Sequence, residues 1–253
     1  MPRSRSSGDD RGPADTLRAL GMSRSFAGIH ALDGVDLELH RHEVVGLIGP
    51  NGAGKSTLVN LITGFDTPDR GRVTLGDTDI TGLAPHLLGR MGLSRTFQQG
   101  HTFPGLSVRE NVEVSALGVG VGPAEATREA ERILRLLDLW SLADEPAGAL
   151  PHGSLRKLGV ARALATSPHF VLFDEPAAGL SESEIPDFAA VIRSLRGDHE
   201  VGVLLIDHNV SLIMSACDRI HVLDQGVMIA AGTPEEIARD PDVATAYLGT
   251  THA

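Results

Sequence analysis

The sequence predicts an α/β protein built on a mainly parallel β-sheet. Three apolar runs of strand length, at residues 170–173, 201–206 and 220–223, alternate with helix-like segments. A strand, a helix and a further strand in this order favour a parallel sheet covered on both faces. A fourth apolar run, at 44–48, passes through a glycine-rich turn into another helix-like segment. The alternation of strand and helix therefore extends over much of the chain.

The N-terminal part of the chain predicts a second, antiparallel set of strands. Residues 17–48 alternate in short apolar and polar blocks, as half-buried strands do. Residues 71–75 and 77–80 predict a hairpin around Gly76. We therefore expect an antiparallel β subdomain beside the parallel sheet.

A helical subdomain is expected between about residues 91 and 164. Within it, residues 124–139 place apolar side chains beside charged ones at helical spacing. The segments before and after this region, about residues 16–90 and 165–253, are expected to form one core. The chain thus predicts a single domain, residues 16–253, with a helical insertion.

Composition excludes several classes of protein. The longest apolar runs, such as 201–206, are far below the roughly 18 residues that a membrane-spanning helix needs. Residues 1–15 are polar, so we expect a disordered N-terminal tail in the cytoplasm rather than a secretion signal. The formal net charge of −11 argues against nucleic-acid binding, which normally requires a basic face. The single cysteine, Cys217, excludes an internal disulfide.

Residues 49–56 read GPNGAGKS and predict a loop that binds phosphate. Its glycines let successive backbone N–H groups turn toward an anion, and the helix that follows adds its positive N-terminal end. Lys55 is expected to reach the β- and γ-phosphates of a nucleotide, and the Ser56 hydroxyl to hold Mg²⁺. A plain turn is the competing interpretation, but this pattern arises by chance in about one chain in a hundred of this length. The residues expected to contact the nucleotide are Gly49, Pro50, Asn51, Gly52, Ala53, Gly54, Lys55, Ser56 and Thr57.

Two adjacent carboxylates follow the apolar run 170–173. We expect Asp174 to organise Mg²⁺ through its water shell, and Glu175 to face the γ-phosphate and orient the attacking water. An acidic turn capped by proline is the alternative, and the phosphate loop favours the catalytic interpretation. His208 follows another apolar run and is expected to contact the γ-phosphate, because ligands bind at the carboxyl edge of open α/β sheets.

Two further residues are weaker candidates by themselves. Gln98, in the segment RTFQ, has an amide that would reach the metal or the attacking water. Phe26 lies in the early strands, and its ring would stack on an adenine or simply pack in the core.

Taken together, the motifs GPNGAGKS, RTFQ, FVLFDEP and LLIDH resemble the ATP-binding subunit of ABC transporters over nearly all of residues 17–249. The runs NLITGF, EPAAGL, DRIHVLDQG and GTPEEIARDPDVATAYLG resemble the LivG branch, which drives uptake of branched-chain amino acids. The resemblance implies the ABC ATPase fold with a P-loop NTPase core, and ATP and Mg²⁺ as ligands. Position by position it implies an adenine-stacking Phe26, a phosphate-binding Lys55, the metal ligands Ser56, Gln98 and Asp174, a catalytic Glu175, a switch histidine His208, and a Gln98 that links hydrolysis to the membrane subunit.

Such subunits pair head to tail, and each ATP lies between the phosphate loop of one and the signature segment of the other. The family signature reads LSGGQ, or LSYGQ in this branch, whereas this chain has Leu150, Pro151, His152, Gly153 and Ser154. Proline at the serine position removes a hydroxyl and a backbone N–H, although Gly153 and the helix N-terminus can still face the partner's phosphate. We therefore expect an asymmetric pair in which this chain's signature segment serves the partner's ATP poorly.

The resemblance also implies the partners. These are a second ABC ATPase subunit, expected to be a different, LivF-like chain, two membrane permease subunits and, indirectly, an external substrate-binding protein. The chain is then expected at the cytoplasmic face of the cell membrane as a peripheral protein, without nucleic acid. Alternatives are uptake of related amino acids, amides or urea, a lipopolysaccharide-export type of ATPase, a soluble ABC ATPase acting on DNA or ribosomes, and a nucleotide-dependent scaffold with little turnover.

Overall fold

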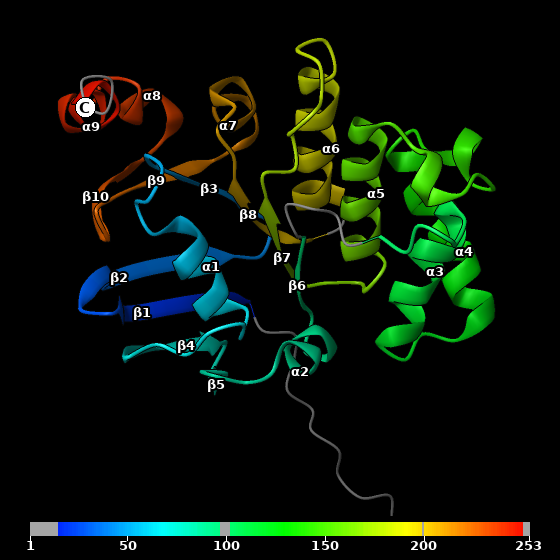
Figure 1. Ribbon diagram of the computed structural model, residues 1–253, viewed down its shortest axis with the longest axis horizontal. Coiled ribbons are helices and arrows are strands. Elements are labelled where there is room, and N and C mark those ends of the chain that lie inside the picture. The colour runs from blue at the N-terminus through cyan, green and yellow to red at the C-terminus, as the bar shows by residue number, and fades with distance from the viewer. Residues whose placement is uncertain (1–14, 97–101, 199, 250–253) are drawn as a thin grey trace, which may run out of the picture.

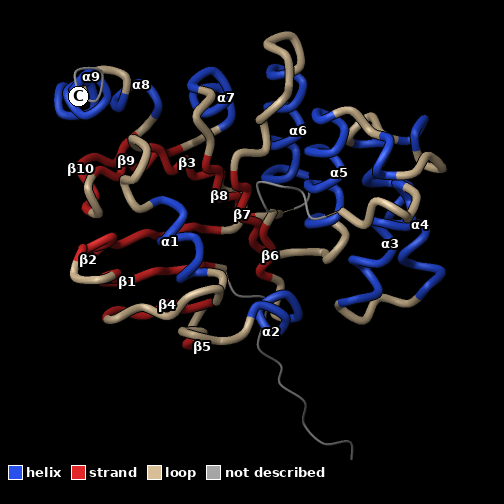
Figure 2. Tube along the Cα trace, viewed as in Figure 1, coloured by secondary structure: helices blue, strands red, loops and turns tan. Residues whose placement is uncertain are grey.

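The computed structural model describes residues 15–96, 102–198 and 200–249. In this part of the chain, a six-stranded sheet stands beside a four-stranded antiparallel sheet, and a group of helices lies at one end (Figures 1 and 2). Because most strands of the six-stranded sheet run parallel to one another, the loops that follow them lie at the same edge of the sheet.

The six-stranded sheet forms the centre of the fold. Its order is β10-β9-β3-β8-β7-β6, and only the edge strand β10 runs antiparallel to its neighbour. Strands β7 and β8 are buried along their whole length, which explains their continuous apolar sequences. The strands predicted at 170–173, 201–206 and 220–223 are confirmed. The bounds are β3 Val44–Ile48, β6 Leu93–Arg95, β7 Phe170–Asp174, β8 Gly202–Ile206, β9 Arg219–Asp224 and β10 Val227–Gly232.

The antiparallel sheet has the order β2-β1-β4-β5 and includes the predicted hairpin around Gly76. One hydrophobic core joins this sheet, helix α1 and one face of the six-stranded sheet, with Leu39, Leu58 and Leu172 all buried in it. Helix α1 is therefore held between two sheets. The bounds are β1 Thr16–Phe26, β2 Ile29–His40, α1 Lys55–Ile62, β4 Arg70–Leu75 and β5 Thr78–Asp79.

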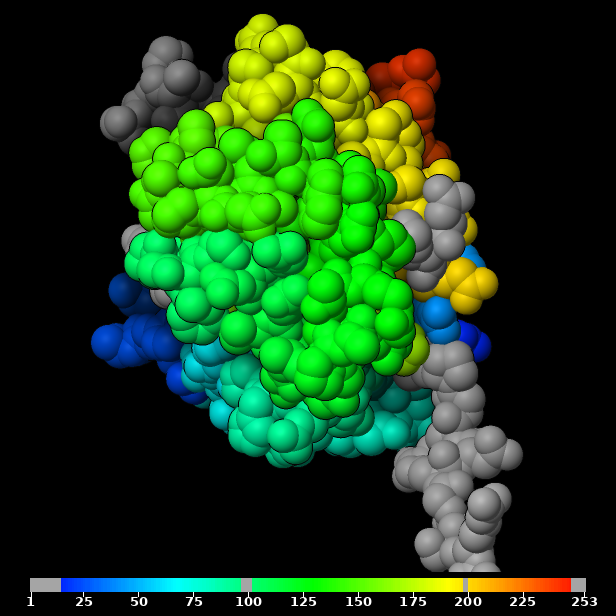
Figure 3. Space-filling model, turned by 90° about the vertical axis from the view of Figure 1, so that its right-hand side faces the viewer, coloured from blue at the N-terminus to red at the C-terminus, as the bar shows by residue number. Residues whose placement is uncertain are grey.

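Three helices form most of the end of the molecule that faces the viewer in Figure 3. They are α3 Val108–Gly118, α4 Pro123–Leu136 and α5 His152–Leu164, with short 3-10 turns at Trp140–Leu142 and Ala147–Ala149 between the last two. Helix α3 begins at a capping box of Ser107 and Glu110. The helix predicted at 124–139 is confirmed as α4, although it ends three residues earlier.

The predicted start of the helical region, at about residue 91, is wrong. Residues 93–95 form β6, which pairs in parallel with β7 and so belongs to the central sheet. A strand of only three residues is too short to display an alternating pattern, so the helical signal around it dominated the prediction. Helix α2, Pro85–Arg90, lies just before this strand.

The remaining helices cover the second face of the central sheet and its edge. Helices α6 and α7 contribute Phe188, Ile192 and Ile213 to a core that includes Val171 and Val203 of the sheet. Their bounds are α6 Ile185–Asp198 and α7 Val210–Ala216, and α8 Pro234–Ile237 and α9 Pro241–Gly249 follow β10. No helix in the described ranges combines the length and the apolar character needed to cross a membrane.

Candidate nucleotide-binding site

The loop between β3 and α1 has a backbone that only glycine allows at two positions. Gly49 and Gly54 have φ angles of 153° and 107°. A Cβ atom on Gly49 would lie 1.9 Å from the carbonyl oxygen of Leu223, and one on Gly54 would lie 2.5 Å from that of Ala31. The glycines therefore let the loop turn tightly against its neighbours, as a phosphate-binding loop must.

Lys55 is the first residue of α1 and folds back over this loop. Its Nζ donates hydrogen bonds to the carbonyl oxygens of Gly49 at 2.6 Å and Pro50 at 2.8 Å. Burial lowers the pKa of the Lys55 ammonium, while the nearby carboxylates of Glu175 and Asp174 act in the opposite direction. The structure thus brings the predicted phosphate lysine within electrostatic reach of both predicted acids.

The donors near the start of α1 fit a magnesium ion. Ser56 is exposed in the first turn of the helix, and Asp174 is the last residue of strand β7. Hydroxyl and carboxylate oxygens suit Mg²⁺, which usually keeps waters and substrate phosphates as its other ligands. In the described part of the chain, no group of three or more His, Cys, Asp or Glu side chains could hold a metal alone. This donor set fits a metal that arrives with a nucleotide.

Glu175 and His208 come from the carboxyl ends of the adjacent strands β7 and β8, and their side chains meet. His208 Nε2 lies 3.0 Å from Glu175 Oε1. Glu175 has a φ angle of 51°, which is uncommon for a residue other than glycine, and its N–H donates to the carbonyl oxygen of Ile206 at 2.7 Å. This backbone turns the carboxylate out of the sheet, where it is 27% exposed. Strained backbone of this kind is frequent at functional sites.

Asp207 is a structural residue of this edge that the sequence analysis missed. It is buried and accepts hydrogen bonds from the N–H groups of Ala177 at 3.0 Å and Asn209 at 2.8 Å. Burial raises the pKa of the Asp207 carboxyl, and these hydrogen bonds oppose that shift. Asp207 therefore ties the turn after Glu175 to the turn that carries His208. The sequence signal that could have identified Asp207 is its position directly before His208.

Arg95 is a second residue whose role the sequence analysis missed. At the end of β6, its guanidinium forms a buried ion pair with Asp174, 2.9 Å from Oδ2. The available signal was the arginine that begins the motif RTFQ. Gln98 itself lies outside the described residues.

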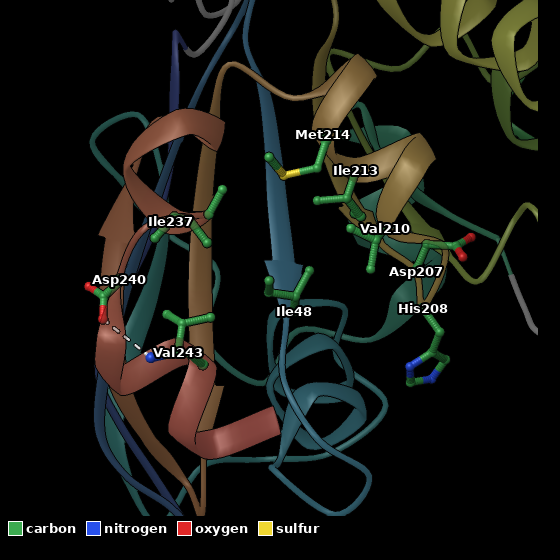
Figure 4. A pocket seen from close by; sticks show the side chains of 11 residues that line it. Ile48, Asp207, His208, Val210, Ile213, Met214, Ile237, Asp240 and Val243 are labelled. Carbon is green, nitrogen blue, oxygen red and sulfur yellow. Dashed lines mark hydrogen bonds between the residues drawn. The ribbon is translucent and has the colours of Figure 1, made fainter. Parts of the chain in front are cut away.

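A mainly apolar pocket of about 340 Å³ opens beside His208, between α7 and helices α8 and α9 (Figure 4). The imidazole of His208 points away from the apolar side chains of this pocket, which agrees with its hydrogen bond to Glu175. The lining residues are Ile48, Asp207, His208, Val210, Ile213, Met214, Ile237, Ala238, Asp240, Val243 and Ala244.

The predicted signature residues form the start of α5. Leu150 is buried, Pro151 precedes the helix without offering a side-chain cap, and His152, Gly153 and Ser154 form its first turn. A Cβ atom on Gly153 would lie 3.3 Å from the carbonyl oxygen of Gly179, so the segment packs against the turn that follows Glu175. In Figure 1, α5 and α1 lie on different sides of strands β6 to β8. A single chain therefore keeps its signature segment apart from its own phosphate loop.

Phe26, the predicted adenine-stacking residue, ends β1 and is 47% exposed. The guanidinium of Arg24 lies 4.9 Å from the ring centroid and is itself paired with Asp66 and Asp69. The ring is therefore a surface group supported by a cation rather than a core residue.

Comparison with known proteins identifies two families. The family model described as "ABC transporter" matches residues 32–178, and the model described as "Branched-chain amino acid ATP-binding cassette transporter" matches residues 227–253.

Curated relatives match over most of their length. The high-affinity branched-chain amino acid transport ATP-binding protein BraF of Pseudomonas aeruginosa is 40% identical, over 92% of this chain and 97% of that protein. The corresponding LivG of Escherichia coli strain K12 is 39% identical, with the same coverage. The lipopolysaccharide export system ATP-binding protein LptB of Acidithiobacillus ferridurans is 37% identical, over 93% of this chain and 98% of that protein.

Solved structures share the fold. The ADP conformation of MJ1267, an ATP-binding cassette of an ABC transporter, is 32% identical with a TM-score of 0.82, over 93% of this chain and 99% of that one. A nucleotide-free ATP-binding cassette from an ABC transporter is 31% identical with a TM-score of 0.83, over 92% and 98% of the two chains.

Proposed function

Because the chain belongs to the ABC transporter family of ATP-hydrolysing subunits, we propose that it uses ATP to drive the uptake of branched-chain amino acids. The observation that carries the catalytic part is the position of Lys55, which covers the glycine loop and lies within electrostatic reach of Asp174 and Glu175. The observation that supports branched-chain amino acids as the substrate is the family match at residues 227–253.

Binding begins at the phosphate loop. The N–H groups of residues 51–57 and the N-terminal end of α1 would hold the phosphate oxygens. Lys55 would exchange its two carbonyl acceptors for the more strongly charged β- and γ-phosphates. Phe26, exposed at the end of β1, would stack on the adenine.

Hydrolysis requires a water molecule aligned with the γ-phosphate. Glu175 would accept a hydrogen bond from this water and polarise it, and His208, 3.0 Å from Glu175 Oε1, would orient the carboxylate and contact the γ-phosphate. Mg²⁺, when bound through Ser56, Gln98 and Asp174, supplies positive charge that stabilises the phosphate oxygens.

Two such subunits would complete the sites. Because the start of α5 lies apart from the phosphate loop of the same chain, each nucleotide would need the signature segment of a partner. We propose a different, LivF-like chain as that partner, two membrane permease subunits bound at the cytoplasmic face, and an external binding protein that delivers the amino acid.

Transport by the assembled complex tests the substrate. The chain, its ATPase partner, its permeases and its binding protein would be reconstituted in vesicles, and ATP-dependent movement of labelled leucine, isoleucine and valine measured. We expect movement of these amino acids and its loss when ATP is replaced by ADP. An assembly that hydrolyses ATP in response to a lipopolysaccharide or an amide, and moves no branched-chain amino acid, would refute the substrate assignment.

A further inference from the structure

Arg95 connects two parts of the candidate site. It ends β6, and the segment that carries Gln98 follows it directly. Its Nη2 donates to Asp174 Oδ2 at 2.9 Å, while its Nη1 donates to Asn60 Oδ1 at 2.7 Å and lies 3.3 Å from Thr63 Oγ1. Asn60 and Thr63 belong to α1 and its C-cap. A single guanidinium therefore joins the acid at the end of β7 to the helix that begins at the phosphate loop.

The contact is buried and directional. The side chains of Arg95 and Asp174 are only 9% and 4% exposed. Arginine presents its donors in a rigid planar fork, so it can bind a carboxylate with one arm and an amide with the other. The compact ammonium of lysine keeps the charge but cannot span both acceptors in the same way. The fork thus fixes the distance between Asp174 and α1.

Backbone contacts strengthen the same connection. The N–H of Asp174 donates to Thr96 Oγ1 at 3.0 Å, and the N–H of Thr96 donates to the carbonyl oxygen of Leu172 at 2.9 Å. Residues 95 and 96 are therefore bound to β7 through both side chain and backbone. Within the described ranges, Oδ2 is the only oxygen of the Asp174 carboxylate that accepts a hydrogen bond.

We propose that Arg95 is a positioning residue for nucleotide binding and hydrolysis. By holding Oδ2 of Asp174 and the amide of Asn60 together, it sets the orientation in which the other carboxylate oxygen of Asp174 serves the magnesium that accompanies ATP. In this proposal Arg95 acts through Asp174 and not by direct contact with the nucleotide or the metal. The inference rests on the proposed function, because this orientation matters only if a magnesium nucleotide binds at the loop.

Binding of a fluorescent ATP analogue to the full chain tests the proposal. The parent and the Arg95→Lys variant would be titrated with the analogue, once across a range of Mg²⁺ concentrations and once with EDTA. We expect the Mg²⁺ concentration for half-maximal binding to rise about tenfold in the variant, as for one lost charge-assisted hydrogen bond, and the affinity in EDTA to change less than about threefold. An unchanged Mg²⁺ requirement, or an equal loss of affinity with and without the metal, overturns the proposal.

A second variant and a matched control separate positioning from general damage. Arg219 also bridges two acceptors, Glu43 Oε1 at 3.0 Å and the carbonyl oxygen of Glu38 at 2.9 Å, but at the start of β9. Arg219→Lys should leave the Mg²⁺ requirement unchanged. If Arg95→Lys does not fold, Asn60→Ala removes the α1 side of the same bridge. The same two titrations, with Mg²⁺ and with EDTA, then test the positioning role in that variant. If the parent binds ATP and the Arg95→Lys variant has the same Mg²⁺ requirement, the positioning role alone is refuted. If the parent shows no magnesium-dependent binding, the proposed function is refuted as well.

Discussion

His208 Nε2 lies 3.0 Å from Glu175 Oε1, although the two residues are far apart in the sequence. They meet because β7 and β8 pair in parallel, with Asp174 beside Ile206, so both strands end at the same edge of the sheet. The positive φ of Glu175 turns its side chain outward at this edge. This contact supports the proposal that the two residues act together in hydrolysis.

Glu175→Gln should abolish turnover without abolishing binding. The amide keeps the size of the side chain and a hydrogen-bonding group for His208 but cannot polarise water as a carboxylate does. We expect the ATPase rate of the assembled complex to fall by at least about 100-fold, the lower range for loss of a general base. Retention of radiolabelled ATP on the complex would measure binding. Equal ATPase rates before and after the change would exclude Glu175 as the catalytic base.

Pro151→Ser should raise the ATPase rate of the assembled pair. Pro151 stands directly before α5 without capping it, and serine would restore both a hydroxyl and an N–H toward the partner's phosphate. A hydrogen bond to a charged group contributes about 1.5–3 kcal/mol, so we expect the contact with the partner's ATP to strengthen about ten- to hundredfold.

Pro151→Ala is the matched control for this change, because it restores the N–H alone and should give a smaller gain. Thermal melting of the isolated variants separates the contact with the partner's ATP from helix capping. An N-cap serine stabilises a helix by about 0.5–2 kcal/mol relative to alanine. A rate identical to that of the parent removes the case for an asymmetric pair.

His221 should make the protein less stable in mild acid. This residue of β9 is 6% exposed, and within the described structure neither ring nitrogen has a hydrogen-bond partner. Burial lowers the pKa of His221 to about 4, with a smaller contribution from Arg219 that Glu43 opposes. The unfolded chain, with a histidine pKa of about 6.5, therefore takes up the proton first, and stability falls as the pH drops from 6.5 toward 4.

Urea unfolding of the parent at pH 7 and pH 5 measures this effect. From the shifted pKa we expect His221 alone to lower the free energy of unfolding by about 2 kcal/mol over this interval. His221→Leu should remove that part of the pH dependence, while His86→Gln, at an exposed position of α2, should keep it. The same pH dependence in the parent and in His221→Leu would show that the buried imidazole is not its source.

The parts of the site that lie within single motifs were predictable from sequence. The loop at 49–56 and the acids at the end of β7 carry their chemistry in adjacent residues, and long apolar runs identified β7, β8 and β9. The short strand β6 was missed because three residues provide no period.

The tertiary contacts of the site were not predictable. Arg95 reaches Asp174 across 79 positions of sequence, and Asp207 reaches Ala177 across 30. Nothing in the local pattern around Arg95 distinguishes a buried bridge from an exposed strand end. Only the pairing of β6 with β7 brings its guanidinium to the carboxylate.

Calorimetric titration of the full chain with ATP in the presence of Mg²⁺ tests the central claim most directly. Lys55→Met keeps the aliphatic stem and removes the ammonium that lies over the loop. Lys157→Met is the control and removes the only other lysine of the sequence, which lies in α5 and pairs with Glu184. We expect magnesium-dependent binding in the parent and in Lys157→Met, and an affinity at least about tenfold lower in Lys55→Met. A parent that does not bind ATP with magnesium, or a Lys55→Met variant that binds it as tightly as the parent, would contradict the account.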